Sequence, residues 1–135
     1  MILDVNVVIS AVISRESRSS TTTLAVDLAY TGASEVVICA HWLGEFEAVL
    51  RLAWMGRYVS ADAIPTILAW VVGATRLVAD PEVIEAVCRD PDDDDLIALA
   101  RSHGATLVSG DADLVSLRGS SPVPILTPRQ YLDLA

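Results

Sequence analysis

The chain has 135 residues, of which 53% are hydrophobic and 20% charged, and this composition predicts one folded domain over residues 1–135 and excludes a disordered tail. The net charge is −9, and all nine basic residues are arginine. The negative charge argues against a module that binds DNA through a basic surface, and the absence of lysine excludes a P-loop and any mechanism that requires a catalytic lysine.

The compartment of the protein can be predicted from features that the sequence lacks. Cys39 and Cys88 form no metal-binding or redox motif, so we expect a reduced intracellular protein. The first residues contain no basic stretch of the kind that begins a signal peptide. The longest apolar run, residues 67–74, is too short to span a bilayer. These observations predict a cytoplasmic protein that does not bind membranes.

The first predicted elements are a short buried strand at residues 2–3 and a helix that begins near Asn6. Apolar residues at positions 5, 8, 9 and 12 have the spacing of one helical face. Asp4 therefore lies between a strand and a helix. Aspartate and asparagine are favoured N-caps, so capping is an alternative explanation for both polar residues. Because further acids occur elsewhere, we favour a site role for Asp4 and leave Asn6 open.

A polar segment over residues 14–23 separates this helix from a second one, which is predicted to end at Gly32. The segment contains Arg15 and Arg18, which could hold a phosphodiester backbone. Ordinary solvated charges are the simpler explanation for both arginines. A second buried strand is predicted at residues 35–39, because this run is continuous and rich in β-branched side chains.

A broad apolar stripe from Trp42 to Trp54 predicts the helix after the second strand. Two glutamates flank the stripe. Glu47 stands four residues before Arg51, a spacing that favours an ion pair. Glu45 has no basic residue three or four positions later, and it lies near the helix start, close to a strand end. Glu45 is therefore the better candidate for a site carboxylate.

A further helix is predicted over residues 60–73, with Pro65 in its early turns. The short apolar segments 77–78 and 83–87 are ambiguous. The apolar faces around residues 42–54 and 64–72 exceed what a small core needs, so we expect a homodimer. No basic residues alternate with the tryptophans, which argues against a base-stacking surface.

Five carboxylates fall within residues 90–95, directly before an apolar run. Asp90 followed by Pro91 has the pattern of an N-cap and a first helical residue, and acids in a first turn interact well with the helix dipole. Capping needs only one or two acids. Asp93 or Asp94 is therefore left to face a cation.

The helix is predicted to end at Gly104, and a strand over residues 105–108 follows. After this strand come Asp111 and Asp113, which could also cap a helix. If the strand is a parallel neighbour of the first one, Asp111 shares a sheet edge with Asp4, where open α/β folds bind ligands. We therefore expect one acidic pocket. A last strand at residues 124–126 and a short helix complete the chain.

The order of these motifs resembles the PIN domain. The resembling residues are Leu3-Asp4-Val5-Asn6, Glu45 at a helix start, Asp90-Pro91-Asp92-Asp93-Asp94, and Ser109-Gly110-Asp111-Ala112-Asp113-Leu114. The resemblance spans nearly the whole chain and is closest to the bacterial, VapC-like branch described as toxins of toxin-antitoxin pairs. It implies a three-layer α/β/α sandwich with a mostly parallel central sheet, which agrees with the predicted alternation of strands and helices.

The resemblance also implies residue roles. It makes Asp4, Glu45, Asp93 and Asp111 the catalytic, metal-binding carboxylates, with Asp94, Asp113 and Asn6 as further contributors and Ser109 in support. It implies a Mg²⁺- or Mn²⁺-dependent endoribonuclease that cleaves single-stranded or structured RNA and binds a cognate antitoxin protein. Hard oxygen ligands suit these ions. The sequence departs from the family pattern at Val5 and at His41-Trp42, and neither departure removes an acid.

Two other classes stay open. An aspartate-based phosphohydrolase or phosphoacceptor domain also places an aspartate after its first strand, but such proteins usually need a lysine near the phosphate, and this chain has none. A catalytically silent PIN-like module would use the acidic pocket only to bind a metal or an arginine of an antitoxin. Cleavage of RNA that disappears when one acid is replaced would distinguish the nuclease from both.

Overall fold

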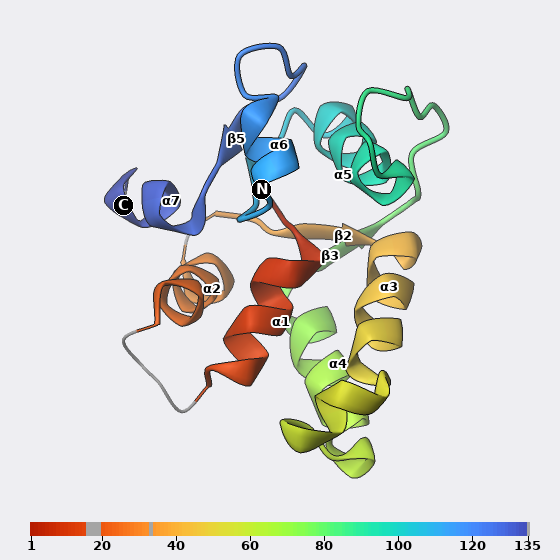
Figure 1. Ribbon diagram of the computed structural model, residues 1–135, viewed down its shortest axis with the longest axis vertical. Coiled ribbons are helices and arrows are strands. Elements are labelled where there is room, and N and C mark those ends of the chain that lie inside the picture. Colours follow the sequence, from red (N-terminus) through yellow and green to blue (C-terminus); the bar gives the residue numbers. More distant parts are fainter. Residues whose placement is uncertain (16–19, 33, 135) are drawn as a thin grey trace.

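A computed structural model describes residues 1–15, 20–32 and 34–134 of the chain (Figure 1). The first half contains β1 (Ile2–Leu3), α1 (Val5–Ile13), α2 (Thr21–Thr31), β2 (Val37–Cys39) and α3 (Ala40–Leu50). Next come two 3₁₀ turns, η1 (Ala53–Arg57) and η2 (Ala61–Ala63), then α4 (Ile64–Ala74) and β3 (Arg76–Val78). The last part contains α5 (Pro91–Ser102), β4 (Leu107–Val108), α6 (Ala112–Ser116), β5 (Ile125–Leu126) and α7 (Pro128–Leu134).

The strands form a parallel arrangement. β4 lies between β1 and β5, and β2 pairs with β3. The Val37 N–H donates to the Met1 carbonyl at 2.9 Å, which places β2 beside β1 and gives the order β3-β2-β1-β4-β5. β1, β2 and β4 are fully buried, as expected for parallel strands covered on both faces. The predicted parallel sheet is confirmed.

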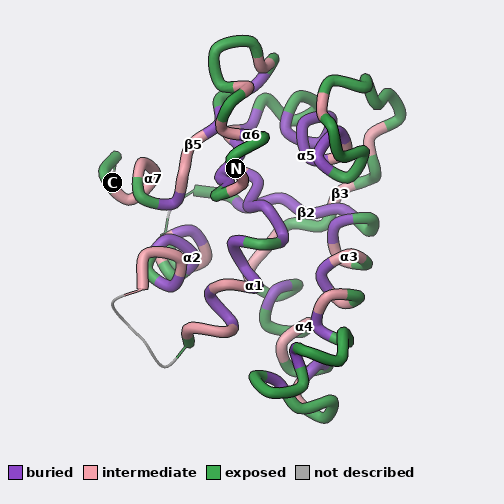
Figure 2. The backbone as a smooth tube through the Cα atoms, viewed as in Figure 1, coloured by how far each residue is buried: buried purple, intermediate pink, exposed green. Residues whose placement is uncertain are grey.

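Helices cover the strands on both sides. α5 packs against β1 and β4, whereas α1 packs against α2 and α3 on the opposite side (Figure 1). The tube coloured by burial shows the buried backbone concentrated where α1, α5 and the central strands meet (Figure 2). This arrangement agrees with the predicted three-layer α/β/α sandwich. No helix in the described ranges is long and apolar enough to cross a membrane.

One predicted boundary was wrong, and the structure assigns two segments that were ambiguous. The apolar stripe predicted one helix to Trp54, but α3 ends at Leu50 and a 3₁₀ turn follows, which leaves the Trp54 side chain 52% exposed. The ambiguous segment 77–78 belongs to β3, whereas segment 83–87 has no regular structure. Both segments are apolar yet largely exposed, with Leu77 56% and Val83 74% exposed, so apolar composition indicated neither their burial nor their secondary structure.

Trp42 connects α3 to the first strand. Its indole N–H donates to the Leu3 carbonyl at 2.8 Å, and its ring stacks on Phe46 with centroids 5.2 Å apart. The Trp42 side chain is only 2% exposed. Because Leu3 directly precedes Asp4, this hydrogen bond helps to fix the end of β1 relative to α3.

We expect Trp42→Phe to lower the free energy of unfolding by about 1–3 kcal/mol, because the buried Leu3 carbonyl loses its donor while most of the ring packing remains. Urea unfolding followed by circular dichroism measures the change. Trp54→Phe is the matched control, since Trp54 is 52% exposed, and it should change stability by less than about 0.5 kcal/mol. Equal losses in the two variants would contradict the role of the buried hydrogen bond.

Candidate active site

Two aspartates follow adjacent parallel strands. Asp4 comes directly after β1, and Asp111 comes shortly after β4, so both lie at the carboxyl edge of the sheet. Asp4 caps α1 by accepting the Asn6 N–H at 3.2 Å, and Asp111 caps α6 by accepting the Asp113 N–H at 2.8 Å. Capping and a site role are therefore compatible, because each cap holds its carboxylate at this edge.

A cleft of about 290 Å³ opens at the same edge, and we call it the acidic cleft. Glu45 reaches it from α3, and Asp93 reaches it from the first turn of α5. Together with Asp4 and Asp111, these residues are the four carboxylates that the sequence predicted to share a site. The remaining polar side chains that line the cleft are Asn6, Asp90 and Asp92.

Crowding in the acidic cleft changes the acidity of its carboxyl groups. Burial, followed by the charges of Asp111 and Asp4, raises the pKa of Asp93 to about 7. Burial also raises the pKa of Asp4, although hydrogen bonds from Ser109 and Asn6 favour its charged form. Like charges that raise one another's pKa are stabilised by a bound cation.

Ser109 connects the two aspartates at the strand ends. Its side chain is fully buried, and its hydroxyl donates to Asp4 Oδ2 at 2.7 Å. The same hydroxyl oxygen accepts the Asp111 N–H at 3.0 Å. Ser109 therefore holds the Asp4 carboxylate and the Asp111 backbone together without lining the acidic cleft.

If the acidic cleft holds Mn²⁺, as the resemblance implies, we expect Ser109→Ala to weaken Mn²⁺ binding by about ten- to hundredfold, because groups that orient metal ligands have effects of this size. Without the hydroxyl donor, the pKa of Asp4 rises further above its ordinary value and its orientation is lost. Electron paramagnetic resonance of free Mn²⁺ measures the dissociation constant. Ser109→Thr keeps the hydroxyl and should bind Mn²⁺ nearly as well as the wild type. Two equally weakened variants would show that packing, and not the hydroxyl, is responsible.

Comparison with known proteins decides the family. The sequence profile of the PIN domain matches residues 1–113. The chain belongs to the PIN domain family. The fold also matches a chain in the crystal structure of VapBC2 from Rickettsia felis bound to a DNA fragment from their promoter, with a TM-score of 0.62, 12% identity and coverage of 93% of this chain and 96% of that chain. Among curated proteins, none matches the sequence at a significant level.

One predicted contributor lies outside the acidic cleft of this PIN domain. Asp94 Oδ1 accepts the N–H groups of Val87 and Cys88, both at 2.8 Å, and the residue is 6% exposed. Burial disfavours its charge, but these donors outweigh burial and hold the pKa of Asp94 below its ordinary value. Asp94 thus attaches the preceding segment to α5, and its carboxylate is not directed at the other four acids.

Two other residues that the sequence predicted for the site, Asp113 and Arg15, do not line the acidic cleft. Asp113 is exposed in the first turn of α6, close enough to raise the pKa of Asp93, but it does not line the acidic cleft. Arg15 lines a different groove, between α1, α2 and α4, so its position gives no support to an RNA contact at the cleft. Arg18 lies outside the described residues.

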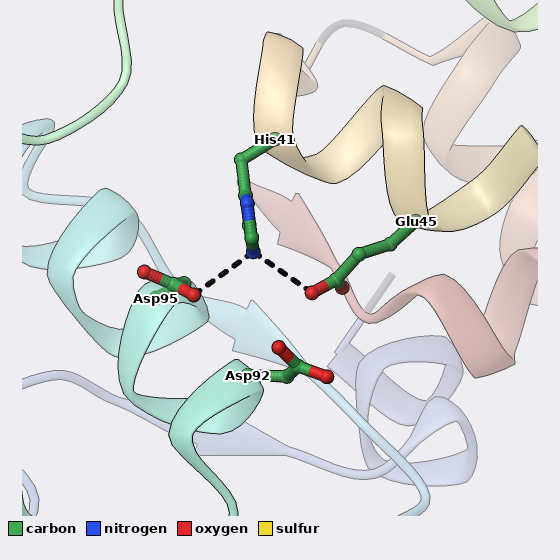
Figure 3. A group of neighbouring side chains, drawn as sticks. All are labelled: His41, Glu45, Asp92 and Asp95. Carbon is green, nitrogen blue, oxygen red and sulfur yellow. Dashed lines mark ion pairs between the residues drawn. The ribbon is translucent and has the colours of Figure 1, made fainter. Parts of the chain in front are cut away.

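His41 lies beside the site, and the sequence did not lead us to expect it there. His41 Nε2 lies 2.8 Å from Glu45 Oε1 and 2.9 Å from Asp95 Oδ2 (Figure 3). The sequence reasoning considered basic partners only after Glu45, whereas His41 stands four residues before it on the same face of α3. The spacing could have indicated the pair within α3, but Asp95 belongs to α5 and required the fold.

The residues of the acidic cleft fit a divalent metal ion. Glu45 Oε1 is buried, and His41 Nε2 lies 2.8 Å from it as an ion-pair partner. A buried carboxylate oxygen is unfavourable unless a cation or a proton satisfies it. The lining carboxylates form the set of hard oxygen ligands that Mg²⁺ and Mn²⁺ prefer.

Proposed function

We propose that this PIN domain is a metal-dependent endoribonuclease that cleaves single-stranded RNA. The observation that supports the proposal is the convergence of Asp4, Glu45, Asp93 and Asp111 on one acidic cleft. PIN domains are generally nucleases, and this chain matches the family over residues 1–113. The reaction adds water across a phosphodiester bond and leaves 5′-phosphate and 3′-hydroxyl ends.

The four carboxylates would hold Mg²⁺ or Mn²⁺. When bound, such an ion would lower the pKa of water and neutralise negative charge on the phosphate. The chain itself supplies fixed orientation. Asp4 and Asp111 are held by helix caps and by Ser109, so they need little rearrangement to present their oxygens. In the metal-free protein Glu45 and Asp93 have pKa values of about 7, so each must release a proton near neutral pH to hold the ion.

We further propose that the protein is the toxin of a toxin-antitoxin pair. The fold likeness to a chain of VapBC2 supports this role and an antitoxin protein as partner. A homodimer is part of the same proposal, because apolar side chains of η1 and α4 remain exposed, with Trp54 at 52% and Trp70 at 42%. Light scattering of the purified protein at micromolar concentration tests the homodimer, and a monomer would contradict it.

Cleavage of a mixed-sequence fluorescent single-stranded RNA tests the activity. We expect cutting with Mn²⁺ or Mg²⁺, no cutting in EDTA, and loss of cutting in Asp4→Asn and Asp111→Asn. Glu47→Gln is the control, since Glu47 pairs with Arg51 at 2.9 Å on the exposed face of α3. Cutting in EDTA, or undiminished cutting by Asp4→Asn, would overturn the proposal. A wild type that binds Mn²⁺ but cuts no RNA would favour a silent module.

A further inference from the structure

A second group of metal-ligating side chains adjoins the acidic cleft, and we call it the His41 cluster: His41, Glu45, Asp92 and Asp95. One ligand atom from each residue lies within 4.8 Å of the others. The four side chains point toward one another, two from α3 and two from α5 (Figure 3). We propose that the His41 cluster binds a divalent transition-metal ion of the zinc type, at a position distinct from the Mg²⁺ or Mn²⁺ site but sharing Glu45 with it.

Helix geometry explains how the cluster forms. His41 and Glu45 stand four residues apart on α3, and Asp92 and Asp95 stand three apart on α5, so each pair lies on one face of its helix. Metal sites between helices are commonly built from such pairs on facing helices. The backbone N–H of His41 also donates to Asp80 at 3.1 Å, which fixes the first turn of α3.

Two carboxylates of the cluster share one histidine nitrogen. His41 Nε2 lies within 2.9 Å of two carboxylates, but a ring nitrogen carries at most one proton and cannot donate fully to both. Glu45 Oε1 is buried, and its ion-pair partner His41 is shared with Asp95. A divalent cation among these atoms would add positive charge that one shared imidazole supplies only in part.

The ligand chemistry indicates the class of metal. An imidazole nitrogen beside carboxylates suits Zn²⁺ and its neighbours, whereas Mg²⁺ keeps to oxygen ligands and water. Zinc binds nitrogen and oxygen at about 2.0–2.2 Å, which places tetrahedral ligand atoms about 3.3–3.6 Å apart. The spacing in the cluster brackets this value, from the 2.8 and 2.9 Å contacts of His41 to the limit of 4.8 Å. The His41 side chain is 43% exposed and that of Asp95 is 23% exposed, so both have room to adjust around an ion.

A bound ion would connect α3 to α5 at one wall of the acidic cleft. Glu45 and Asp92 line both the acidic cleft and the His41 cluster, whereas His41 and Asp95 belong to the cluster alone. This difference allows the two sites to be separated by mutation. His41 and Asp95 can be replaced without touching Asp4, Asp93 or Asp111.

The test is calorimetric titration of the metal-free Asp4→Asn/Asp111→Asn variant with Zn²⁺, because this background weakens the acidic cleft and leaves the His41 cluster intact. We expect one zinc ion per chain and no displacement by a tenfold excess of Mg²⁺. Adding His41→Gln should weaken zinc binding at least tenfold. His103→Gln is the matched control, since His103 is the second of the two histidines and lies exposed at the end of α5.

A second readout separates metal binding from a purely structural role of His41. Zinc should shift the imidazole nuclear magnetic resonance signals of one histidine, and His41→Gln should remove that shifted signal. If His41→Gln does not fold, Asp95→Asn provides the same comparison, with the same expected tenfold loss. Equal zinc affinity with and without His41 and Asp95 would overturn the proposal. Because the readout is binding, failure of RNA cleavage would refute the proposed activity and leave this inference standing.

Discussion

Asp93→Asn should abolish RNA cleavage and, at the same time, make the metal-free protein more stable at pH 8. Asp93 is 8% exposed, and burial together with Asp111 and Asp4 raises its pKa to about 7. At pH 8 the wild type therefore holds a charge that its surroundings disfavour, and asparagine removes that charge while keeping nearly the same shape. Loss of a metal-binding carboxylate should lower the cleavage rate by more than about a hundredfold, the upper limit for a residue that only orients a ligand.

The stabilisation has a definite dependence on pH. The folded pKa of Asp93, about 7, lies above the unfolded value of 3.8, so the wild type loses stability as the pH rises from about 4 through 7. The advantage of Asp93→Asn should be absent near pH 4 and complete above pH 7. A gain on the order of 1 kcal/mol would raise Tm by about 3–6 °C.

Thermal unfolding in EDTA at pH 4, 6 and 8 measures this advantage, and the RNA assay measures the loss of activity. Asp62→Asn is the matched control, because Asp62 is exposed in η2, and it should change neither quantity. A destabilised Asp93→Asn at pH 8 would show that the Asp93 carboxylate is stabilised in the folded protein, contrary to the raised pKa. Opposite effects on activity and stability are expected where a site is built from mutually repelling groups.

The positions of Asp4 and Asp111 could be predicted because the features that place them are local. Each follows a short apolar strand and caps the next helix, and the pairing of Leu3 with Val108 aligns the two strand ends. A strand, a cap and a helix are all readable from composition and spacing. Once the strands were expected to be parallel, a shared edge for the two carboxylates followed.

The choice between Asp93 and Asp94 could not be predicted in the same way. Both are buried in the first turn of α5, but they point in different directions around the helix. Asp93 faces the acidic cleft, whereas Asp94 accepts two N–H groups from residues 87 and 88, a segment without regular structure. No sequence periodicity indicates where such a segment places its backbone donors.

The His41 cluster shows a second limit. Each of its two pairs has helical spacing that the sequence contains, yet a histidine four residues before a glutamate is common on helix surfaces. The cluster exists because α3 and α5 face each other across the end of the sheet (Figure 3). Contacts between elements about 50 residues apart depend on packing, which local patterns do not specify.

The second large effect concerns pH and metal together: at limiting Mn²⁺, cleavage should fall steeply below about pH 7. Glu45 and Asp93 both have pKa values of about 7 in the metal-free protein. Metal ligands must be deprotonated, so protonation of either residue removes one ligand from the ion. The rate should fall about tenfold for each pH unit if one proton limits binding, and up to about a hundredfold if both do.

Saturating Mn²⁺ should move the midpoint of this profile to lower pH, because the cation stabilises the charged form of both carboxylates. Initial rates from pH 5.5 to 8.5 at two Mn²⁺ concentrations measure the shift. Glu45→Gln removes one of the two titrating groups, so its Mn²⁺ binding, measured by electron paramagnetic resonance, should show the shallower slope of a single proton. A wild-type profile that stays flat to pH 5.5 at limiting Mn²⁺ would mean that neither carboxylate controls metal binding. A midpoint independent of Mn²⁺ would instead assign the titration to a group outside the metal site.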